Sequence, residues 1–186
     1  MMVPSGPLRY AARVIQAGGV VAYPTESVFG LGCDPLELPA VERIINCKGR
    51  SAAAGLILLA DDYSRLRPFI EPGEQEEARM LATWPGPVTW VCTASAAAPP
   101  WITGGRATVA VRVTGHEISA ALCRAAGMAI VSTSANRSGR PPCRSAVQVR
   151  RRLFRDVDYI LAGRTGGRRR PSEIRDARTG DILRAG

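Results

Sequence analysis

Residues 108–136, TVAVRVTGHEISAALCRAAGMAIVSTSAN, contain the alternation that decides the fold. The first six of these residues predict a strand, and apolar side chains recur at helical spacing over 116–126. A second apolar run, 128–131, predicts another strand, and the polar stretch 132–136 predicts a turn after it. A strand, a helix and a second strand in this order are typical of an α/β sheet.

The rest of the chain repeats this alternation with short elements. Helices are predicted over about 8–15, 39–47, 62–69, 73–83 and 144–154. Strands are predicted over about 20–23, 55–59, 88–92 and 158–161, and loops over 25–35, 94–100 and 164–172. Because several strands follow one another closely, we predict a single α/β domain over 1–186, with a mixed, twisted sheet flanked by helices.

The numbers of cysteines and histidines restrict the chemistry that this chain can carry. Five scattered cysteines with no CxxC pair fit reduced thiols in a cytoplasmic protein, most of them small core hydrophobes: Cys33, Cys47, Cys92, Cys123 and Cys143. His116 is the sole histidine, so a histidine-rich zinc site is excluded and no protein metal site is expected. Its place just before a helical pattern favours a role at the helix N-terminus over catalysis.

Membrane and export signals are not evident in the sequence. No stretch approaches the ~18 to 20 unbroken apolar residues that a membrane span needs. Residues 1–7 lack a basic segment followed by an apolar run, so we expect no signal peptide and a cytoplasmic location.

The net charge of +9 is concentrated at one end of the chain. Residues 1–136 carry 11 basic and 11 acidic side chains, whereas 137–186 carry 14 arginines against 5 carboxylates. The arginine clusters 150–152 and 168–170 indicate a surface for polyanions or a polyphosphate cleft. A solvated helix face is the alternative interpretation of 150–152.

Several polar side chains lie where a sheet protein places a ligand. Lys48 is the sole lysine of the chain, and its ammonium is a compact point charge where guanidinium is a planar fork. Arg112 interrupts an apolar strand and needs an anion, which is either a ligand phosphate or a structural carboxylate. The hydroxyls and amide of 132–136 fit a ligand-binding turn or plain turn chemistry, and Thr25-Glu26-Ser27 is equally ambiguous.

No glycine-rich phosphate loop is present in this sequence. There is no GxxxxGK[ST] motif, and Gly30-Leu31-Gly32 lacks the third glycine of a dinucleotide fingerprint. A bound nucleotide would therefore have its phosphates held by side-chain cations and hydroxyls. The candidates are Lys48, Arg50, Arg112, Ser134, Asn136 and the loop 166–170.

These segments together resemble the YrdC family, and the chain ending resembles its short, single-domain bacterial branch, TsaC. The resemblance covers about residues 8–186. It rests on the ordered motifs VAYPTE (21–26), GLGCD (30–34), KxR (48–50), WPGP (84–87), AVRV (110–113), STSANxSG (132–139) and GGR…PSEIRD (166–176).

The resemblance implies a nucleotidyltransferase, threonylcarbamoyl-AMP synthase. In this reaction L-threonine, bicarbonate and ATP give L-threonylcarbamoyl-adenylate and pyrophosphate. A tRNA-modifying threonylcarbamoyltransferase complex then transfers the group to the adenine beside the anticodon. The family fold implies a large basic cavity, and Mg²⁺ is expected to bridge the ATP phosphates.

The resemblance also assigns expected roles to individual residues. Lys48 and Arg50 match the family's catalytic, phosphate-binding KxR. The other residues expected to bind ATP are Thr108, Arg112, Ser134 and Asn136. The residues expected to line the threonine pocket are Thr25, Ser132 and Ser172. Three positions depart from the common pattern: Ser51, Gly55 and Glu173.

Two other functions compete with this one. The charge asymmetry supports a double-stranded RNA- or tRNA-binding module, or a ribosome-maturation module, without its own catalysis. Aromatic residues are almost absent from 137–186, which argues against base stacking but not against recognition of duplex shape. The third reading, carbamoyl-adenylate chemistry as in hydrogenase maturation proteins, involves much longer multidomain chains.

Overall fold

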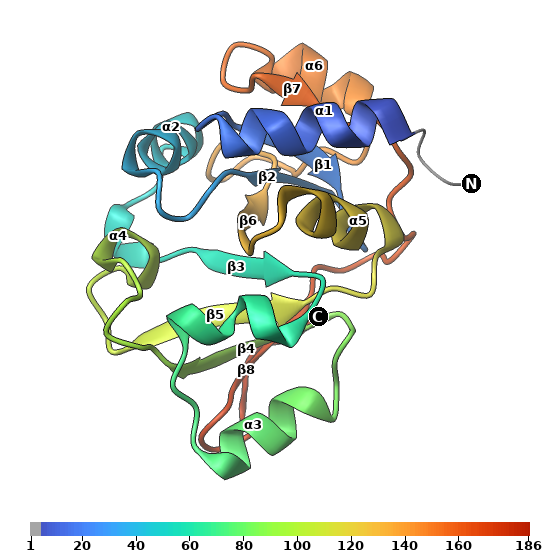
Figure 1. The fold of residues 1–186 in the computed structure, drawn as a ribbon. Helices are drawn as coiled ribbons and strands as arrows, with labels where there is room; N and C mark the ends of the chain where they lie inside the picture. Colours follow the sequence, from blue (N-terminus) through green and yellow to red (C-terminus); the bar gives the residue numbers. More distant parts are fainter. Residues whose placement is uncertain (1–4) are drawn as a thin grey trace.

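The computed structural model describes residues 5–186, which form a single α/β domain around a mixed nine-stranded sheet (Figure 1). Residues 1–4, part of the predicted domain, lie outside the described residues. The strand order is β7-β1-β2-β6-β3-β5-β4-β8-β9. The strands are β1 (Val21–Pro24), β2 (Phe29–Gly32), β3 (Ile57–Ala60), β4 (Val88–Thr93), β5 (Thr108–Val113), β6 (Ile130–Ser134), β7 (Tyr159–Ile160), β8 (Glu173–Asp176) and β9 (Ile182–Arg184).

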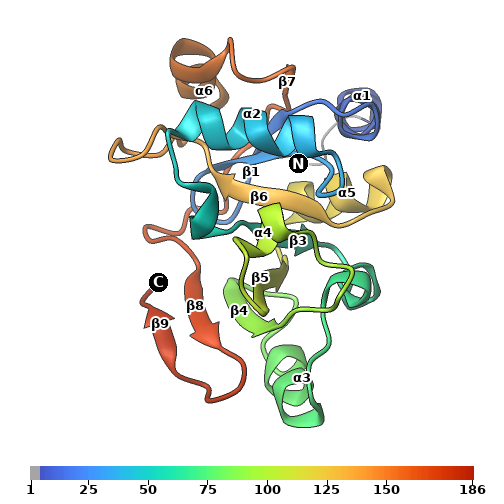
Figure 2. The same cartoon turned by 90° about the vertical axis from the view of Figure 1, so that its left-hand side faces the viewer.

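Both pairing directions occur in the sheet, as the closely spaced strands predict. β3 pairs parallel with β5, β4 with β8 and β1 with β7. The other neighbours pair antiparallel. The hairpin of β8 and β9 extends the sheet beyond β4, which Figure 2 shows at the lower left.

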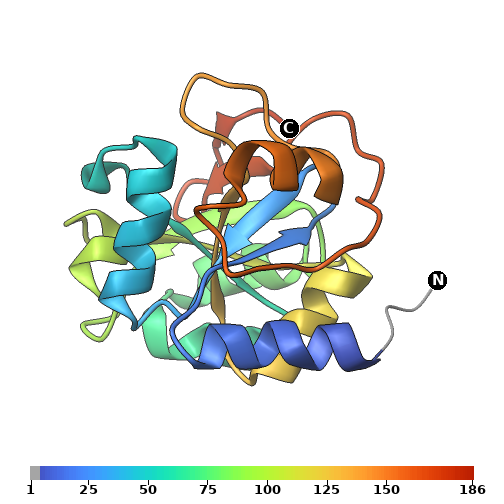
Figure 3. The same ribbon diagram turned by 90° about the horizontal axis from the view of Figure 1, so that it is seen from above.

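Helices cover the sheet on both sides. They are α1 (Ser5–Gln16), α2 (Leu38–Lys48), α3 (Glu74–Leu81), α4 (Pro100–Thr103), α5 (Glu117–Ala126) and α6 (Ala146–Leu153), with short 3₁₀ turns η1 (Ala52–Ala54), η2 (Tyr63–Arg65) and η3 (Arg67–Phe69). α1 and α5 pack against each other over one face, where Figure 3 shows them side by side. Ile15, Leu122 and Ile130 belong to the apolar cluster that they bury. None of the helices among residues 5–186 is both long and apolar enough to cross a membrane.

The alternation along β5 assigns its side chains to two faces. Val109, Val111 and Val113 are buried in the larger core cluster. Thr108, Ala110 and Arg112 therefore project from the opposite face, because successive side chains of a strand point to opposite sides. This second face is the one that α1 and α5 cover only in part.

His116 caps α5, as its position before a helical pattern predicts. Its Nδ1 accepts a hydrogen bond from the Ser119 backbone N–H at 3.4 Å, and its Nε2 lies 3.2 Å from the Arg164 carbonyl oxygen. Burial lowers the pKa of His116. A neutral ring with Nε2 protonated satisfies both contacts, which explains why a histidine serves as this cap.

The predicted loop over 25–35 is wrong in its middle, where the chain forms strand β2. Phe29 and Leu31 are fully buried, and Gly30 and Gly32 alternate with them. A Cβ on Gly32 would lie 2.8 Å from the Tyr23 ring and 2.7 Å from the Val131 carbonyl oxygen. The glycines are therefore needed for the Tyr23 ring to lie on the sheet, although glycine is depleted in strands generally.

Three further expectations need correction. The predicted helix over 62–69 consists of the turns η2 and η3, with Pro68 inside η3. The predicted turn over 132–136 begins later, because β6 continues to Ser134 and pairs with Gly30. The tail forms β8 and β9, for which no strand is predicted.

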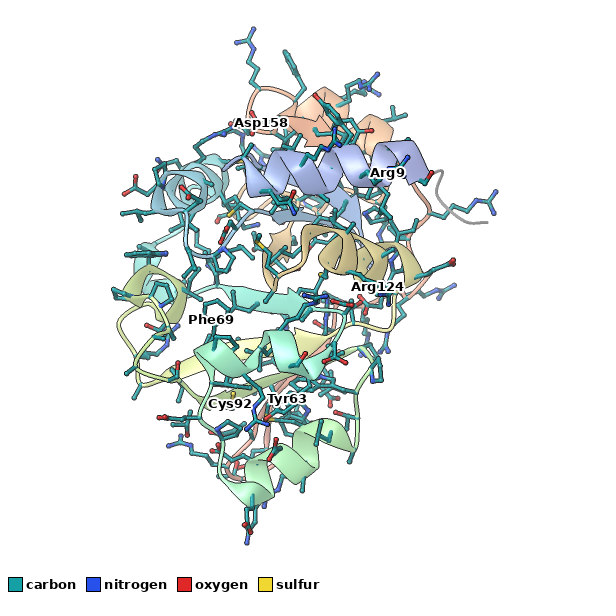
Figure 4. All side chains as sticks on the ribbon, viewed as in Figure 1. Arg9, Tyr63, Phe69, Cys92, Arg124 and Asp158 are labelled. Atoms are coloured by element: carbon teal, nitrogen blue, oxygen red, sulfur yellow. The ribbon has the colours of Figure 1, made fainter. Side chains whose placement is uncertain are left out.

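The five cysteines are free and buried, as expected of small core residues. Figure 4 labels one of these cysteines, Cys92, and another buried core residue, Phe69. It also labels the exposed Arg9 and Arg124. Burial raises the pKa of the Cys47 thiol to about 11. These thiols therefore stay protonated near neutral pH and are poor nucleophiles.

Candidate active site

A cavity of about 700 Å³ opens on the second face of the sheet, in the part that α1 and α5 leave uncovered. Its floor follows one row of register partners across five strands. The row runs through Ser132, Ile57, Ala110, Val91 and Asp176. The walls come from the turn after β1, from η1 and the loop after α4, from the segment after β6, and from the hairpin of β8 and β9.

Eight of the nine predicted site residues line this one cavity, although they come from five separate segments. They are Thr25, Arg50, Thr108, Arg112, Ser132, Ser134, Asn136 and Ser172. The ninth, Lys48, lies behind the lining and is only 4% exposed. The sequence motifs are thus brought together in space, with Lys48 in contact with two of the lining residues.

The Lys48 ammonium is surrounded by oxygens of the segment after β6. Its Nζ donates to the Ser134 and Asn136 carbonyl oxygens, and it lies 3.2 Å from Asn136 Oδ1 and 3.4 Å from Ser134 Oγ. Burial, and then the charge of Arg50, lower the pKa of Lys48 to about 8. Among residues 5–186 the ammonium has dipolar partners but no carboxylate, so an anion placed beside it would be favoured.

The amide of Asn136 is held in one orientation by its neighbours. Ser134 Oγ donates to Asn136 Oδ1 at 2.6 Å. Asn136 Nδ2 donates to the carbonyl oxygens of Arg137 and Arg140 at 2.9 and 2.8 Å. The Lys48, Ser134 and Asn136 side chains therefore form one connected network at the edge of the cavity.

Arg112 has a carboxylate partner, which is the structural alternative that the sequence leaves open. Its Nη2 lies 3.4 Å from Glu26 Oε2, and both side chains are largely buried. Glu26 Oε1 also accepts a 2.7 Å hydrogen bond from Thr114 Oγ1. Arg112 Nε and Glu26 Oε2 are buried without a hydrogen-bond partner among the described residues, so the pair is only partly satisfied.

The hydroxyls expected in the threonine pocket already have partners within the protein. Thr25 Oγ1 donates to the Val28 carbonyl oxygen at 2.7 Å, and Tyr23 donates to Ser132 Oγ at 2.8 Å. Burial raises the pKa of Tyr23, which keeps its hydroxyl protonated as a donor. Ser172 Oγ lies 3.2 Å from Thr89 Oγ1. The Thr25 hydroxyl is thus occupied as a donor, whereas Ser132 Oγ accepts from Tyr23 and keeps its own hydrogen for another partner.

The loop 166–170 is not among the lining residues, so its arginines do not belong with the phosphate candidates. Its backbone instead joins the turn after β1: Gly166 N–H donates to the Thr25 carbonyl oxygen and Arg168 N–H to the Glu26 carbonyl oxygen, at 3.0 and 3.1 Å. The arginine side chains 168–170 are exposed. The loop therefore ties down a cavity wall through its backbone.

Sequence reasoning missed three cavity arginines and one carboxylate, which are Arg106, Arg178, Arg184 and Asp176, and it left the role of Glu26 open. The charge excess of 137–186 points to this part of the chain, but its most obvious clusters, 150–152 and 168–170, lie outside the cavity. Arg106 follows a small-residue loop with no motif. Only the pairing of β4 with β8 brings Arg184 to the cavity.

Comparison with known proteins agrees with this geometry. The Sua5/YciO/YrdC family model, described as "Telomere recombination", matches residues 13–186. A Nitrosococcus oceani protein named threonylcarbamoyl-AMP synthase is 54% identical over 99% of this chain and 100% of its own length. A Thiobacillus denitrificans protein of the same name is 55% identical over 92% of this chain and 91% of its own.

A solved structure has the same fold. P. abyssi Sua5 complexed with L-threonine superposes with a TM-score of 0.84 at 39% identity, over 91% of this chain. This chain spans about half the length of that Sua5, since the match covers 50% of it. The chain described here therefore belongs to the Sua5/YciO/YrdC family.

Proposed function

We propose that this chain is a threonylcarbamoyl-AMP synthase, an enzyme that makes L-threonylcarbamoyl-adenylate and pyrophosphate from L-threonine, bicarbonate and ATP. The observation that carries the proposal is the convergence of eight of the nine predicted site residues in one cavity. The full-length identity to proteins of that name supports it.

The nucleotide is proposed to bind where the cations are. Lys48 and Arg50 hold phosphate oxygens, with Ser134 and Asn136 as neutral partners. Thr108 and Arg112 complete the ATP contacts. Adenylation needs charge neutralisation and alignment more than covalent catalysis, and this set of cations and hydroxyls meets that need.

Threonine is proposed to lie against Thr25, Ser132 and Ser172. Its neutral amine attacks the carbon of bicarbonate, and loss of water leaves a carbamate. A carbamate oxygen then attacks the α-phosphorus of ATP, and the bond to pyrophosphate breaks. Holding the three substrates in one cavity turns these steps into intramolecular ones.

Mg²⁺ is proposed to arrive with ATP, bound to its phosphates. Within residues 5–186 no three His, Cys, Asp or Glu side chains form a group that could hold a metal ion. The two carboxylates that line the cavity among the described residues, Glu26 and Asp176, are paired with Arg112 and Arg178. The enzyme therefore binds MgATP as its substrate, since Mg²⁺ commonly keeps its waters and binds through phosphates.

The product is proposed to pass to a tRNA-modifying threonylcarbamoyltransferase complex in the cytoplasm. An adenylate is a mixed anhydride that water destroys, so a partner must consume it promptly. The five free thiols fit a reducing compartment. A binding-only module for double-stranded RNA or tRNA is not favoured, because the full-length relatives carry the name of a synthase.

Pyrophosphate release from the purified protein tests the proposal. Release with MgATP should require both threonine and bicarbonate, and a new adenylate should appear on chromatography. Asn136→Ala should abolish release, whereas Asn46→Ala, on the exposed face of α2, should leave it unchanged. Release that is independent of threonine, or no release from the folded protein, would reject the synthase.

A further inference from the structure

Helix α6 presents a stripe of mixed apolar and basic side chains to solvent. The α6 stripe consists of Val147, Arg150, Arg151 and Phe154. These positions are spaced i, i+3, i+4 and i+7, so they share one face of the helix, and Phe154 follows α6 directly with helical backbone angles. Val147 is 66% exposed and Phe154 is 58% exposed. Val149 and Leu153, in contrast, are buried in the core, so the stripe is the face of α6 that the fold leaves uncovered.

The arginines of the stripe have no acidic partner. Among residues 5–186 no carboxylate lies within 4.0 Å of either guanidinium. The two aspartates that follow α6 are engaged elsewhere, Asp156 with Arg137 at 3.4 Å and Asp158 with Arg43 at 2.9 Å. The positive charge of the stripe is therefore available to a partner from outside the chain.

The apolar members of the stripe favour a protein over a nucleic acid as the partner. Burial of Val147 and Phe154 is favourable only against another apolar surface, whereas duplex RNA is recognised mostly through phosphates and 2′-hydroxyls. The Arg155 guanidinium lies 5.6 Å from the centroid of the Phe154 ring. One face of this ring is therefore already covered, which hinders stacking between bases. Aromatic residues and arginine are enriched at protein interfaces, as they are in this stripe.

A second copy of this chain is a poor occupant of the stripe. A twofold dimer would bring the same arginines together from both copies, and like charges across an interface oppose association. The complementary surface is instead acidic around an apolar groove. The stripe thus fits a different protein, one with carboxylates beside a pocket for an aromatic side chain.

The N-terminal end of α6 is joined to a wall of the cavity. Arg144, just before the helix, donates through Nη2 to the Arg169 carbonyl oxygen at 2.8 Å. The loop that contains Arg169 leads directly to Pro171 and Ser172, which line the cavity. Residues 146–153 do not line it. A protein on α6 would therefore lie beside the segments that frame the cavity and leave the substrate site free.

We propose that the α6 stripe is the docking surface for the protein that consumes the adenylate, and that this protein offers carboxylates around an apolar groove. The inference rests on the proposed function, since it assigns the acceptor of the product to a surface of this chain. The exposed Val147 and Phe154 are the anchors, and the arginines steer the acidic partner toward them. Docking beside the cavity shortens the path of a product that water destroys.

Binding of the purified threonylcarbamoyltransferase complex to the full chain, measured by biolayer interferometry, tests the apolar anchors. Val147→Ser combined with Phe154→Ser should weaken binding by about tenfold or more, because the anchors lose their apolar contact. Leu81→Ser is the matched control, since Leu81 is 47% exposed on α3, at the opposite end of the molecule from α6 (Figure 1). Its affinity should stay within about twofold of the wild type. Circular dichroism confirms that each variant is folded.

Charge reversal tests the basic part of the stripe in the same assay. Arg150→Glu combined with Arg151→Glu should weaken binding by about tenfold or more and remove most of its dependence on salt, because the acidic partner is then repelled. Arg67→Glu is the matched control, since Arg67 is exposed on η3 and also has no carboxylate partner among the described residues. It should leave the affinity within about twofold of the wild type.

Pyrophosphate release by the same variants separates docking from catalysis, and it should stay within about twofold of the wild type in all of them. No measurable binding of the wild-type chain to the complex, or unchanged binding in the stripe variants, overturns the docking surface even in an active synthase. Loss of double-stranded RNA binding in the arginine variant alone, with unchanged binding of the complex, assigns the stripe to RNA and also overturns it. Weakened binding of the complex in the stripe variants alone supports the surface, even where the wild type forms no adenylate and the proposed function fails.

Discussion

The cavity holds two kinds of arginine. Arg112 is paired with Glu26, which Thr114 also contacts. Among the residues that the structure describes, Arg50, Arg106 and Arg184 have only backbone carbonyl oxygens as hydrogen-bond partners. The paired arginine is neutralised without ligand, and the three unpaired arginines are not.

This difference shows that some buried cations stabilise the fold and others are left to bind a ligand. A buried cation with its own carboxylate contributes to the fold, because losing one partner leaves the other unpaired. A buried cation without a carboxylate partner destabilises the free protein until an anionic ligand binds. Such unpaired groups are common at functional sites. Removing the paired arginine should therefore affect stability, and removing an unpaired arginine should affect ligand binding.

The largest expected effect is at Lys48, whose pKa is lowered by burial and then by the charge of the unpaired Arg50. Lys48→Arg should lower the rate of pyrophosphate release by about 100-fold or more, because a planar fork cannot replace a point donor among the Ser134 and Asn136 oxygens. Initial rates at saturating ATP measure it. Arg9→Lys, on exposed α1, is the control for a cation exchange and should be silent. A rate near that of the wild type in Lys48→Arg would remove Lys48 from the site.

The next effect separates the paired arginine from the unpaired ones by its effect on stability. Arg112→Ala should lower the free energy of unfolding by about 2–3 kcal/mol, because the largely buried Glu26 carboxylate loses its charged partner. Arg50→Ala should change it by less than about 0.5 kcal/mol, because repulsion is relieved as contacts are lost. Urea unfolding curves of the two variants give the comparison.

A double-mutant cycle isolates the Glu26–Arg112 pair. Glu26→Gln with Arg112→Ala should cost less than the two single changes added together, because the charges are coupled. Strict additivity would contradict the pairing. ATP affinity of Arg112→Ala, measured by calorimetry, then tells whether Arg112 also reaches a phosphate.

A smaller effect appears in the pH dependence of ATP binding. Lys48 has a pKa of about 8 in the free protein, and a bound phosphate favours its charged form. Binding should therefore take up about half a proton at pH 8 and most of one at pH 9. Affinity falls as pH rises through this range, since more of the free lysine is neutral. Calorimetry in buffers of different ionisation enthalpy measures the uptake, and Lys48→Arg should abolish it; uptake that persists assigns the proton elsewhere.

The smallest effect on catalysis is expected outside the cavity, on α6. Arg150 and Arg151 are exposed and do not line the cavity. Changing both to alanine should alter pyrophosphate release by less than about twofold. If this surface binds RNA, the same variant should bind double-stranded RNA more weakly and with a shallower salt dependence. A large loss of release would show that α6 contributes to catalysis.

How much the sequence predicts depends on how local the signal is. Lys48, Ser134 and Asn136 lie in short motifs at strand and helix ends, so their roles can be proposed from the chain alone. Arg106 and Arg184 have no local signature. They become site residues only through strand pairings between segments distant in sequence, which composition and periodicity do not encode.

The same contrast holds for the fold. The helix after β5 and its histidine cap follow from periodicity and position. β2 is missed because its glycines, needed beside the Tyr23 ring, contradict strand propensity. β8 is missed because three of its four residues are charged, and β9, at the edge of the sheet, is missed because it has only three residues. Neither strand shows the apolar alternation of a half-buried strand.

The parallel pairing of β4 with β8 has a consequence for the protein during its synthesis. Residues 88–91 must wait for 173–176 before this part of the sheet can close, and Arg184 follows later still. A nascent chain that has reached α6 already contains most of its buried core, but it lacks the cavity wall that the hairpin of β8 and β9 provides. The cavity is therefore completed only at the end of translation.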